Sequence, residues 1–157
     1  MPLTVGLISD THGLLRASAL HALEGVELIL HAGDVGNRDV LIELAALAPV
    51  QAVHGNVDDP FTPELEAHRW LSLEGWQIHV SHGHELVRPT PEALLHRYPD
   101  AEILVFGHTH RALVHRAGGK LVVNPGAAGP RRFDVSPSVA RLTLAPGVAE
   151  VEIVGIE

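Results

Sequence analysis

Seven side chains that can bind a metal cation follow five apolar runs, at the points where predicted strands end. Each group of ligands stands beside a glycine, which lets the backbone approach a site closely. The seven are Asp10, His12, Asp34, Asn56, His82, His108 and His110. Because the chain has no cysteine, thiolate nucleophiles and thiolate zinc sites are excluded. Carboxylate, imidazole and amide ligands instead suit divalent cations such as Mn²⁺, Fe²⁺, Co²⁺, Ni²⁺ and Zn²⁺.

This ligand set is too large for one tetrahedral ion and large enough for two. Two ions about 3.5–4 Å apart can clamp a phosphoryl group and lower the pKa of a bridging water. Such a pair needs a bridging carboxylate, and Asp34 is the candidate because it is the single ligand at its strand end. The expected chemistry is therefore hydrolysis of a phosphoester.

The elements that must position these ligands alternate between strands and helices. Apolar runs predict strands over 3–8, 26–30 and 50–53, and amphipathic segments over 15–23 and 39–47 predict helices between them. This order indicates a parallel core with helices on its faces. Beyond it we expect hairpins over 69–80 and 112–123, a helix over 91–98, a strand over 103–106 and a closing β pair over 139–154. We expect residues 1–157 to form one domain.

Parallel strands bring their carboxyl ends to the same edge of a sheet, so ligands far apart in sequence can meet there. The motif Gly107-His108-Thr109-His110 shows the pattern most clearly, because it follows the buried run 103–106 directly. We expect the backbone to leave the regular pleat at this glycine.

The net charge and the length of the apolar runs indicate which kinds of molecule the protein can bind. The formal net charge is −8, which disfavours non-specific binding along a nucleic-acid backbone. A phosphate substrate is still compatible, because bound cations reverse the sign of the charge locally. No apolar run approaches a membrane span, and the first residues lack the basic start of a signal peptide, so we expect a cytoplasmic protein with no membrane contact.

In these residues and their order the chain resembles the calcineurin-like metallophosphoesterase superfamily, and within it the small single-domain prokaryotic phosphodiesterases. Motif blocks in family order carry the resemblance: Asp10-x-His12, Gly33-Asp34, Gly55-Asn56-x-Asp58, His82-Gly83-His84 and Gly107-His108-Thr109-His110. Asn124-Pro125-Gly126 with a following arginine is a further family-like feature.

The resemblance implies an α/β fold in which a two-sheet β-sandwich is flanked by helices, with a two-metal site at one edge. The first metal would take Asp10, His12, Asp34 and His110, and the second would take Asp34, Asn56, His82 and His108. A hydroxide bridging both ions would attack phosphorus in line. Mn²⁺ is the first choice of ion, with Ni²⁺, Co²⁺, Fe²⁺ and Zn²⁺ as alternatives.

One position departs from the pattern of many family members. Val57 stands where they carry a histidine that helps to protonate the leaving oxygen. His54 is a candidate substitute as general acid or phosphate ligand, with a structural hydrogen bond at the strand end as the equal alternative. Asp58 is a candidate for orienting a metal ligand, and a turn-capping role is as plausible.

Weaker candidates surround the same motifs. His84 could line the pocket, and Thr11 and Thr109 could direct donors at phosphate. Arg131 or Arg132 could bind a substrate phosphate through two hydrogen bonds from one guanidinium group. For Asn124 we favour a role in a buried turn.

The leading functional hypothesis is a metal-dependent phosphodiesterase acting on a small phosphoester substrate. Two alternatives remain: a phosphomonoesterase, and a non-catalytic module in which the metal site serves structure or interaction. A nuclease is disfavoured because the chain is acidic and has few aromatic residues for base stacking. Pairing of hairpin edges into a homo-oligomer is left open.

Overall fold

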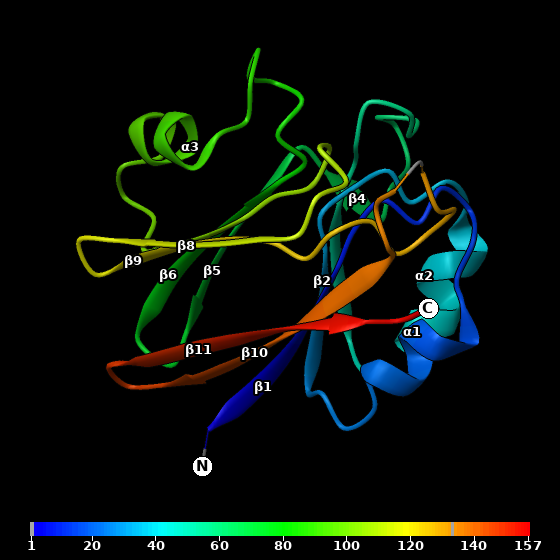
Figure 1. Ribbon diagram of the computed structural model, residues 1–157, viewed down its shortest axis with the longest axis horizontal. Coiled ribbons are helices and arrows are strands. Elements are labelled where there is room, and N and C mark those ends of the chain that lie inside the picture. The colour runs from blue at the N-terminus through cyan, green and yellow to red at the C-terminus, as the bar shows by residue number, and fades with distance from the viewer. Residues whose placement is uncertain (1, 133) are drawn as a thin grey trace.

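In the computed structural model two β-sheets pack face to face, and the helices cover the outer faces of the sheets (Figure 1). The structure describes residues 2–132 and 134–157. The first sheet has the strand order β11-β10-β1-β2-β3-β4. Its strands are β1 (Leu3–Ile8), β2 (Leu28–His31), β3 (Val50–Val53), β4 (Leu65–Glu66), β10 (Ser138–Ala145) and β11 (Val148–Gly155). This architecture confirms the predicted α/β sandwich. The two-residue strand β4 was not predicted.

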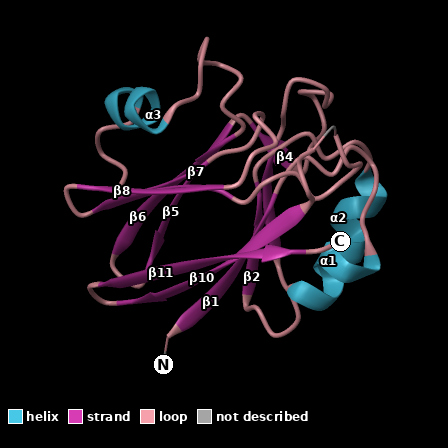
Figure 2. Ribbon diagram, in the orientation of Figure 1, coloured by secondary structure: helices cyan, strands magenta, loops and turns pink. Residues whose placement is uncertain are grey.

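The second sheet has the order β5-β6-β7-β9-β8. Its strands are β5 (His68–Leu73), β6 (Trp76–Ser81), β7 (Ile103–Val105), β8 (Leu113–Ala117) and β9 (Lys120–Asn124), and the helices are α1 (Ala17–Ala22), α2 (Arg38–Ala45) and α3 (Pro91–Arg97). Both sheets contain a parallel core, β1-β2-β3-β4 in the first and β6-β7-β9 in the second. The carboxyl ends of these parallel strands lie at one edge, where Figure 2 shows the loops gathered.

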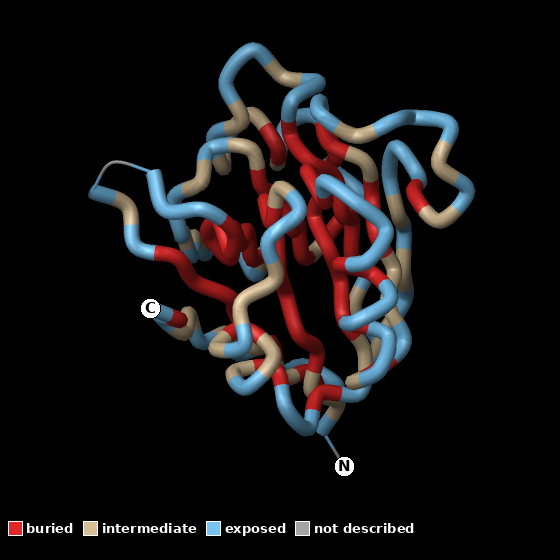
Figure 3. Tube along the Cα trace, turned by 90° about the vertical axis from the view of Figure 1, so that its right-hand side faces the viewer, coloured by how far each residue is buried: buried red, intermediate tan, exposed pale blue. Residues whose placement is uncertain are grey.

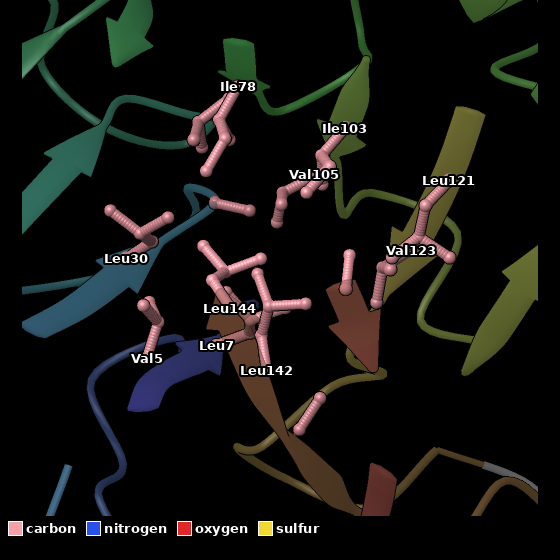
Figure 4. Close-up of a cluster of buried hydrophobic side chains, with 14 of the residues drawn as sticks. Val5, Leu7, Leu30, Ile78, Ile103, Val105, Leu121, Val123, Leu142 and Leu144 are labelled. Carbon is pink, nitrogen blue, oxygen red and sulfur yellow. The ribbon is translucent and has the colours of Figure 1, made fainter. Parts of the chain in front are cut away.

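Strands β1, β2, β7 and β9 bury apolar side chains on both faces, because each of them packs against the other sheet on one face and is covered on the other. Val5 and Leu7 of β1 pack between the sheets, and Figure 4 shows them opposite Val105 and Val123. Ile8 points to the other face of the first sheet, where it packs in the cluster that contains residues of α1 and α2. A third apolar cluster lies between α3 and the second sheet. Such two-sided burial explains the nearly continuous apolar runs of the sequence, and Figure 3 shows the buried strands at the centre of the molecule.

The short helix α3 begins as its sequence dictates. Thr90 Oγ1 accepts a hydrogen bond from the N–H of Ala93 at 3.1 Å, and Pro91 occupies the first helical position. Both features favour a helix start. None of the described helices is long or apolar enough to cross a lipid bilayer.

Candidate metal centre

The loops that follow β1, β2, β3, β6 and β7 bring all seven predicted ligand positions to one place. Two groups have their ligand atoms within 4.8 Å of one another: Asp10, His12, Asp34 and His110 form the first, and Asp34, His82 and His108 form the second. Asn56 lines a cavity of about 270 Å³ together with residues of both groups. Asp34 belongs to both groups, as its isolation at the end of β2 suggested. We call this cavity the metal cavity.

The backbone is strained at the ligands themselves. In the described part of the chain six non-glycine residues have a positive φ, and all but one of them are ligand candidates: Asp10, His12, Asp34, His108 and His110, with φ between 46° and 71°. Non-glycine residues rarely adopt this conformation, and where they do it commonly marks a functional site. The predicted departure from the regular pleat thus occurs at the ligands, beside the glycines.

Two glycines are required because ligand carboxylates occupy the space of their missing side chains. A Cβ atom at Gly55 would overlap Asp34 Oδ1, and a Cβ atom at Gly107 would overlap the side chains of Ser9 and Asp10. The close approach of backbone and carboxylate at these two positions lets ligands from separate strands share one cavity.

The Asp34 carboxylate lies between histidines of the two groups. Its Oδ2 atom is 3.2 Å from His82 Nε2 and 3.6 Å from His12 Nε2, whereas its Oδ1 atom accepts a hydrogen bond from the Val57 N–H at 3.1 Å. His82 Nδ1 donates to the Ala32 carbonyl at 2.8 Å, which holds the ring so that Nε2 faces Asp34 and the site. A backbone carbonyl that fixes the tautomer of a histidine in this way is typical of metal ligands.

Whether a cation fits here can be judged from the buried polar atoms that have no hydrogen-bond partner. Asp10 Oδ2 accepts hydrogen bonds from Ser9 Oγ at 2.6 Å and from the His108 N–H at 3.1 Å. Asp10 Oδ1 and His12 Nε2, in contrast, are buried without a hydrogen-bond partner among the described residues. A buried polar atom left unpaired costs free energy. A divalent cation would satisfy both atoms, so the donor set fits a metal.

Electrostatic interactions keep the carboxylates charged. Burial raises the pKa of Asp10, but the neighbouring rings of His110, His12 and His82 and the hydrogen bond from Ser9 together outweigh it and hold the pKa of Asp10 well below its ordinary value. Burial raises the pKa of Asp34, but the hydrogen bond and charge of His82, together with the hydrogen bond from the Val57 N–H, outweigh this effect and lower it. The same pairing raises the pKa of His82, against the effect of its burial. At neutral pH both carboxylates are therefore in the form that binds metal.

Comparison with known proteins agrees with this geometry. Residues 3–147 match the calcineurin-like phosphoesterase superfamily domain. The chain belongs to that superfamily. The match confirms the resemblance that the motif blocks carry.

Two relatives show the range of similarity within the superfamily. A probable metallophosphoesterase of Methanothermobacter thermautotrophicus is 36% identical over 146 residues, which cover 88% of this chain and 85% of that protein. A phosphodiesterase of Methanocaldococcus jannaschii is 25% identical over 144 residues, which cover 78% of this chain and 82% of that protein.

Solved structures share the fold of this phosphoesterase domain. Vacuolar Protein Sorting 29 from Cryptosporidium parvum matches with a TM-score of 0.83 at 24% identity, over 97% of this chain and 96% of that chain. Wild-type Vps29 from Entamoeba histolytica, solved in complex with Zn²⁺, matches with a TM-score of 0.78 at 25% identity, over 99% of this chain and all of that chain.

His31 is a supporting residue of the phosphoesterase site that sequence reasoning missed. It is fully buried, and its Nδ1 atom accepts a hydrogen bond from the Gly33 N–H at 3.1 Å. Its Nε2 atom therefore carries the proton and donates to Thr11 Oγ1 at 3.0 Å, and Thr11 in turn donates to the Val35 carbonyl at 2.8 Å. Burial lowers the pKa of His31 to about 4, so the ring is neutral. The chain of bonds ties the Asp10 loop to the Asp34 loop.

Asp58 connects the loops after β2 and β3. Its carboxylate accepts hydrogen bonds from the N–H groups of Val35, Gly36 and Gly55, at 3.0, 3.0 and 2.8 Å. These bonds hold the backbone on both sides of Asp34 and next to Asn56. These hydrogen bonds give Asp58 the turn-capping role that the sequence left open, and all of them go to backbone N–H groups and none to a candidate ligand side chain.

The weaker candidates separate in the structure. The Thr11 hydroxyl donates its proton to the Val35 carbonyl at 2.8 Å, so it does not serve as a phosphate donor. Thr109 Oγ1 accepts from Asn124 Nδ2 at 3.0 Å and keeps its own proton for donation. Asn124 is fully buried and also donates to the Gly107 carbonyl at 3.1 Å, which braces the loop that carries His108 and His110.

The remaining candidates differ in whether they line the metal cavity. Arg131 pairs with Glu157, whereas Arg132 lines the metal cavity. His54 and His84 are not among the described residues that line this cavity. Burial and the charge of His82, with a smaller contribution from His54, lower the pKa of His84.

A hollow larger than the metal cavity lies away from this site. It has a volume of about 600 Å³ and is bounded by the β8–β9 and β10–β11 turns, with Trp76 and Arg116 on its walls. Among the described residues, both groups of candidate metal ligands lie at the other edge, so size alone does not locate the chemistry.

Proposed function

We propose that this protein is a metal-dependent phosphodiesterase that holds two divalent cations, with Asp34 shared between them. The observation that carries the proposal is the meeting of two ligand groups at one carboxylate, beside buried ligand atoms that have no other partner. The diester specificity is supported by the relative named a phosphodiesterase. Mn²⁺ is the first ion to test.

The cations, when bound, supply positive charge that polarises a phosphoryl group and acidifies water. The residues of the chain provide the rest. Asp10 and Asp34 stay ionised through the low pKa values described above. Arg132, as the arginine that lines the metal cavity, binds a phosphate oxygen, because a guanidinium offers a planar pair of donors. Arg131 is paired with Glu157 and takes no part in this binding.

The leaving oxygen needs a proton that Val57 does not carry. We retain His54 as the proposed source, because it directly follows β3 and stands two residues before the candidate ligand Asn56. An activated p-nitrophenyl ester needs no such proton, whereas an alkyl ester does. His54→Ala should therefore lower kcat/KM on the alkyl ester selectively, and equal retention of activity on both esters would remove His54 from the mechanism.

The decisive experiment compares an activated diester and an activated monoester on Mn²⁺-loaded protein. We expect higher kcat/KM on bis-p-nitrophenyl phosphate than on p-nitrophenyl phosphate. The reverse order would indicate a phosphomonoesterase. Arg132→Ala and Arg131→Ala form a matched pair, and we expect the first to raise KM about tenfold and the second to leave KM within twofold.

The alternative is a binding module that holds metal without turnover. Two structural neighbours are named for vacuolar protein sorting and not for an activity, and one of them was solved with Zn²⁺. Stoichiometric metal binding without hydrolysis of either ester would favour this alternative.

A further inference from the structure

A second cavity opens next to the metal cavity. We call it the side cavity: it has a volume of about 350 Å³ and lies between the N-terminal end of α2 and the loop over 57–65. Val57 lines both cavities, and its residue surface is 55% exposed. The Val57 N–H is also the group that binds Asp34 Oδ1. One side chain therefore separates the metal ligands from the side cavity.

We propose that the side cavity holds one ester substituent of a phosphodiester, namely an uncharged, hydroxyl-bearing group that stays on phosphorus during hydrolysis. This inference rests on the proposed function, since the side cavity would be the second half of the same substrate site. A phosphomonoester has no group to place there, so the side cavity also accounts for a preference for diesters.

The walls of the side cavity suit an alcohol of moderate size. Leu41 and Leu65, which are 9% and 8% exposed, provide apolar surface, and Asn37 and Thr62 provide polar groups. Asn37 Oδ1 is already the cap of α2, because it accepts from the Val40 N–H at 3.3 Å, and this bond leaves the Asn37 amino group as a donor. The wall therefore combines apolar side chains with polar ones, which a substituent that carries hydroxyl groups can match.

The charges around the side cavity disfavour an anionic substituent. Asp58 and Asp59 both line it, and Asp58 is satisfied by backbone N–H groups. The guanidinium of Arg38, which lines the same cavity, is paired with Glu64. No cation is therefore left unpaired among the described residues of the wall to receive a second phosphate or a carboxylate. An uncharged substituent avoids the repulsion from these carboxylates.

The position of Val57 indicates which substituent enters. A leaving alkoxide requires a proton donor nearby. Val57 is the residue that the linings of the two cavities share, and its side chain has no proton to give. The substituent on this side is therefore the one that is retained, and the leaving group departs elsewhere.

The test uses three p-nitrophenyl phosphodiesters that share one leaving group and differ in the retained group, which is methyl, 2,3-dihydroxypropyl or 2-carboxyethyl. On Mn²⁺-loaded protein we expect kcat/KM for the dihydroxypropyl ester to exceed that for the methyl ester about tenfold, and the carboxyethyl ester to be no better than the methyl ester. Thr62→Trp, which fills the side cavity, should reduce the tenfold ratio to near one. Ser72→Trp, on exposed β5, should keep it.

A second variant tests the charge argument. Glu64→Gln releases Arg38, so kcat/KM for the carboxyethyl ester should rise severalfold relative to the methyl ester. A shift of the melting temperature by Mn²⁺ equal to that of the wild type shows that each variant is folded and loaded. Equal kcat/KM for the methyl and dihydroxypropyl esters, or an unchanged ratio in Thr62→Trp, overturns the inference alone. Absence of turnover on all three esters overturns the proposed function and the inference with it.

Discussion

Histidines cluster in two buried places, at the metal cavity and beneath α3. In the second place, which we call the outer cluster, His79 of β6 is 1% exposed and its ring stacks on Tyr98 with centroids 3.8 Å apart. His79 Nε2 lies 3.1 Å from His68 Nδ1, and Trp70 packs against the His79 ring at 4.6 Å. Both clusters bury imidazoles, yet their surroundings differ in kind.

The difference lies in carboxylates and backbone. The metal cavity holds Asp10 and Asp34 with ionised oxygens directed at its histidines. In the outer cluster the nearby carboxylate of Glu85 is occupied, because it accepts from the Tyr98 hydroxyl and from the Gly83 N–H. His68 and His79 lie on regular strands, whereas the ligand loops contain the residues of positive φ. Buried histidine alone is therefore a poor sign of a metal site, and histidine with strained, carboxylate-bearing loops is a good one.

The largest expected effect comes from the shared carboxylate. Asp34→Asn removes the charge common to both ligand groups, so we expect kcat/KM on bis-p-nitrophenyl phosphate to fall at least about a thousandfold, which corresponds to roughly 4 kcal/mol of transition-state stabilisation. Metal content after dialysis against Mn²⁺ should fall as well. Steady-state kinetics together with elemental analysis checks both expectations.

Two controls sharpen this test. Asp100→Asn makes the same chemical change at an exposed loop carboxylate, and His79→Phe removes a buried imidazole of the outer cluster. Both variants should bind Mn²⁺ and turn over substrate as the wild type does. Loss of metal in His79→Phe would contradict the division between the two clusters, and near wild-type activity in Asp34→Asn would contradict the two-metal proposal.

The sequence contained enough to place the ligands. Apolar runs that lead into Asp10, Asp34, His82 and His108, with a glycine within three residues of each, predicted convergence because parallel strands end at one edge. The boundaries were less accurate, since β2 starts at Leu28 and not at residue 26. Strand ends depend on pairing with neighbours, which local composition does not report.

Residues that act through distant partners were beyond sequence reasoning. His31 acquires its role only when Thr11 packs against it across the sheet, and the difference between Arg131 and Arg132 depends on the distant Glu157. His79 lies on the face of β6 opposite Ile78 and Val80, because neighbouring side chains of a strand alternate. That face is buried as well, because α3 covers it with Tyr98. Each of these outcomes is set by long-range packing and not by local pattern.

An intermediate effect concerns the pH dependence of stability. Burial and the charge of His68 lower the pKa of His79 to about 4, against an ordinary value of 6.5. Above pH 6.5 both folded and unfolded states have a neutral ring. Between pH 6.5 and 4 only the unfolded chain binds the proton. The free energy of unfolding therefore decreases as the pH is lowered, by as much as about 3 kcal/mol at pH 4. Urea unfolding in EDTA at several pH values measures this loss.

His79→Phe isolates the contribution of the outer cluster. Phenylalanine does not titrate, so the variant should lose less stability than the wild type over the same interval. His31, whose pKa is also about 4, keeps its own share of the pH dependence in both proteins. Parallel curves for the wild type and His79→Phe would show that His79 does not titrate below its ordinary range.

The smallest effect is expected at the exposed edge of the outer cluster. His79 Nδ1 is already without a hydrogen-bond partner among the described residues, and His68 provides the contact to Nε2. His68→Ala should therefore destabilise the fold by about 1 kcal/mol, or roughly 2–4 °C in melting temperature, because the second ring nitrogen loses its partner. His68→Gln can restore a donor and should recover most of this loss. Neither variant should change kcat/KM or metal content, because the outer cluster supports α3 and does not contribute a ligand. A metal-dependent difference between the melting temperatures of the two variants would show that His68 is coupled to the metal cavity after all.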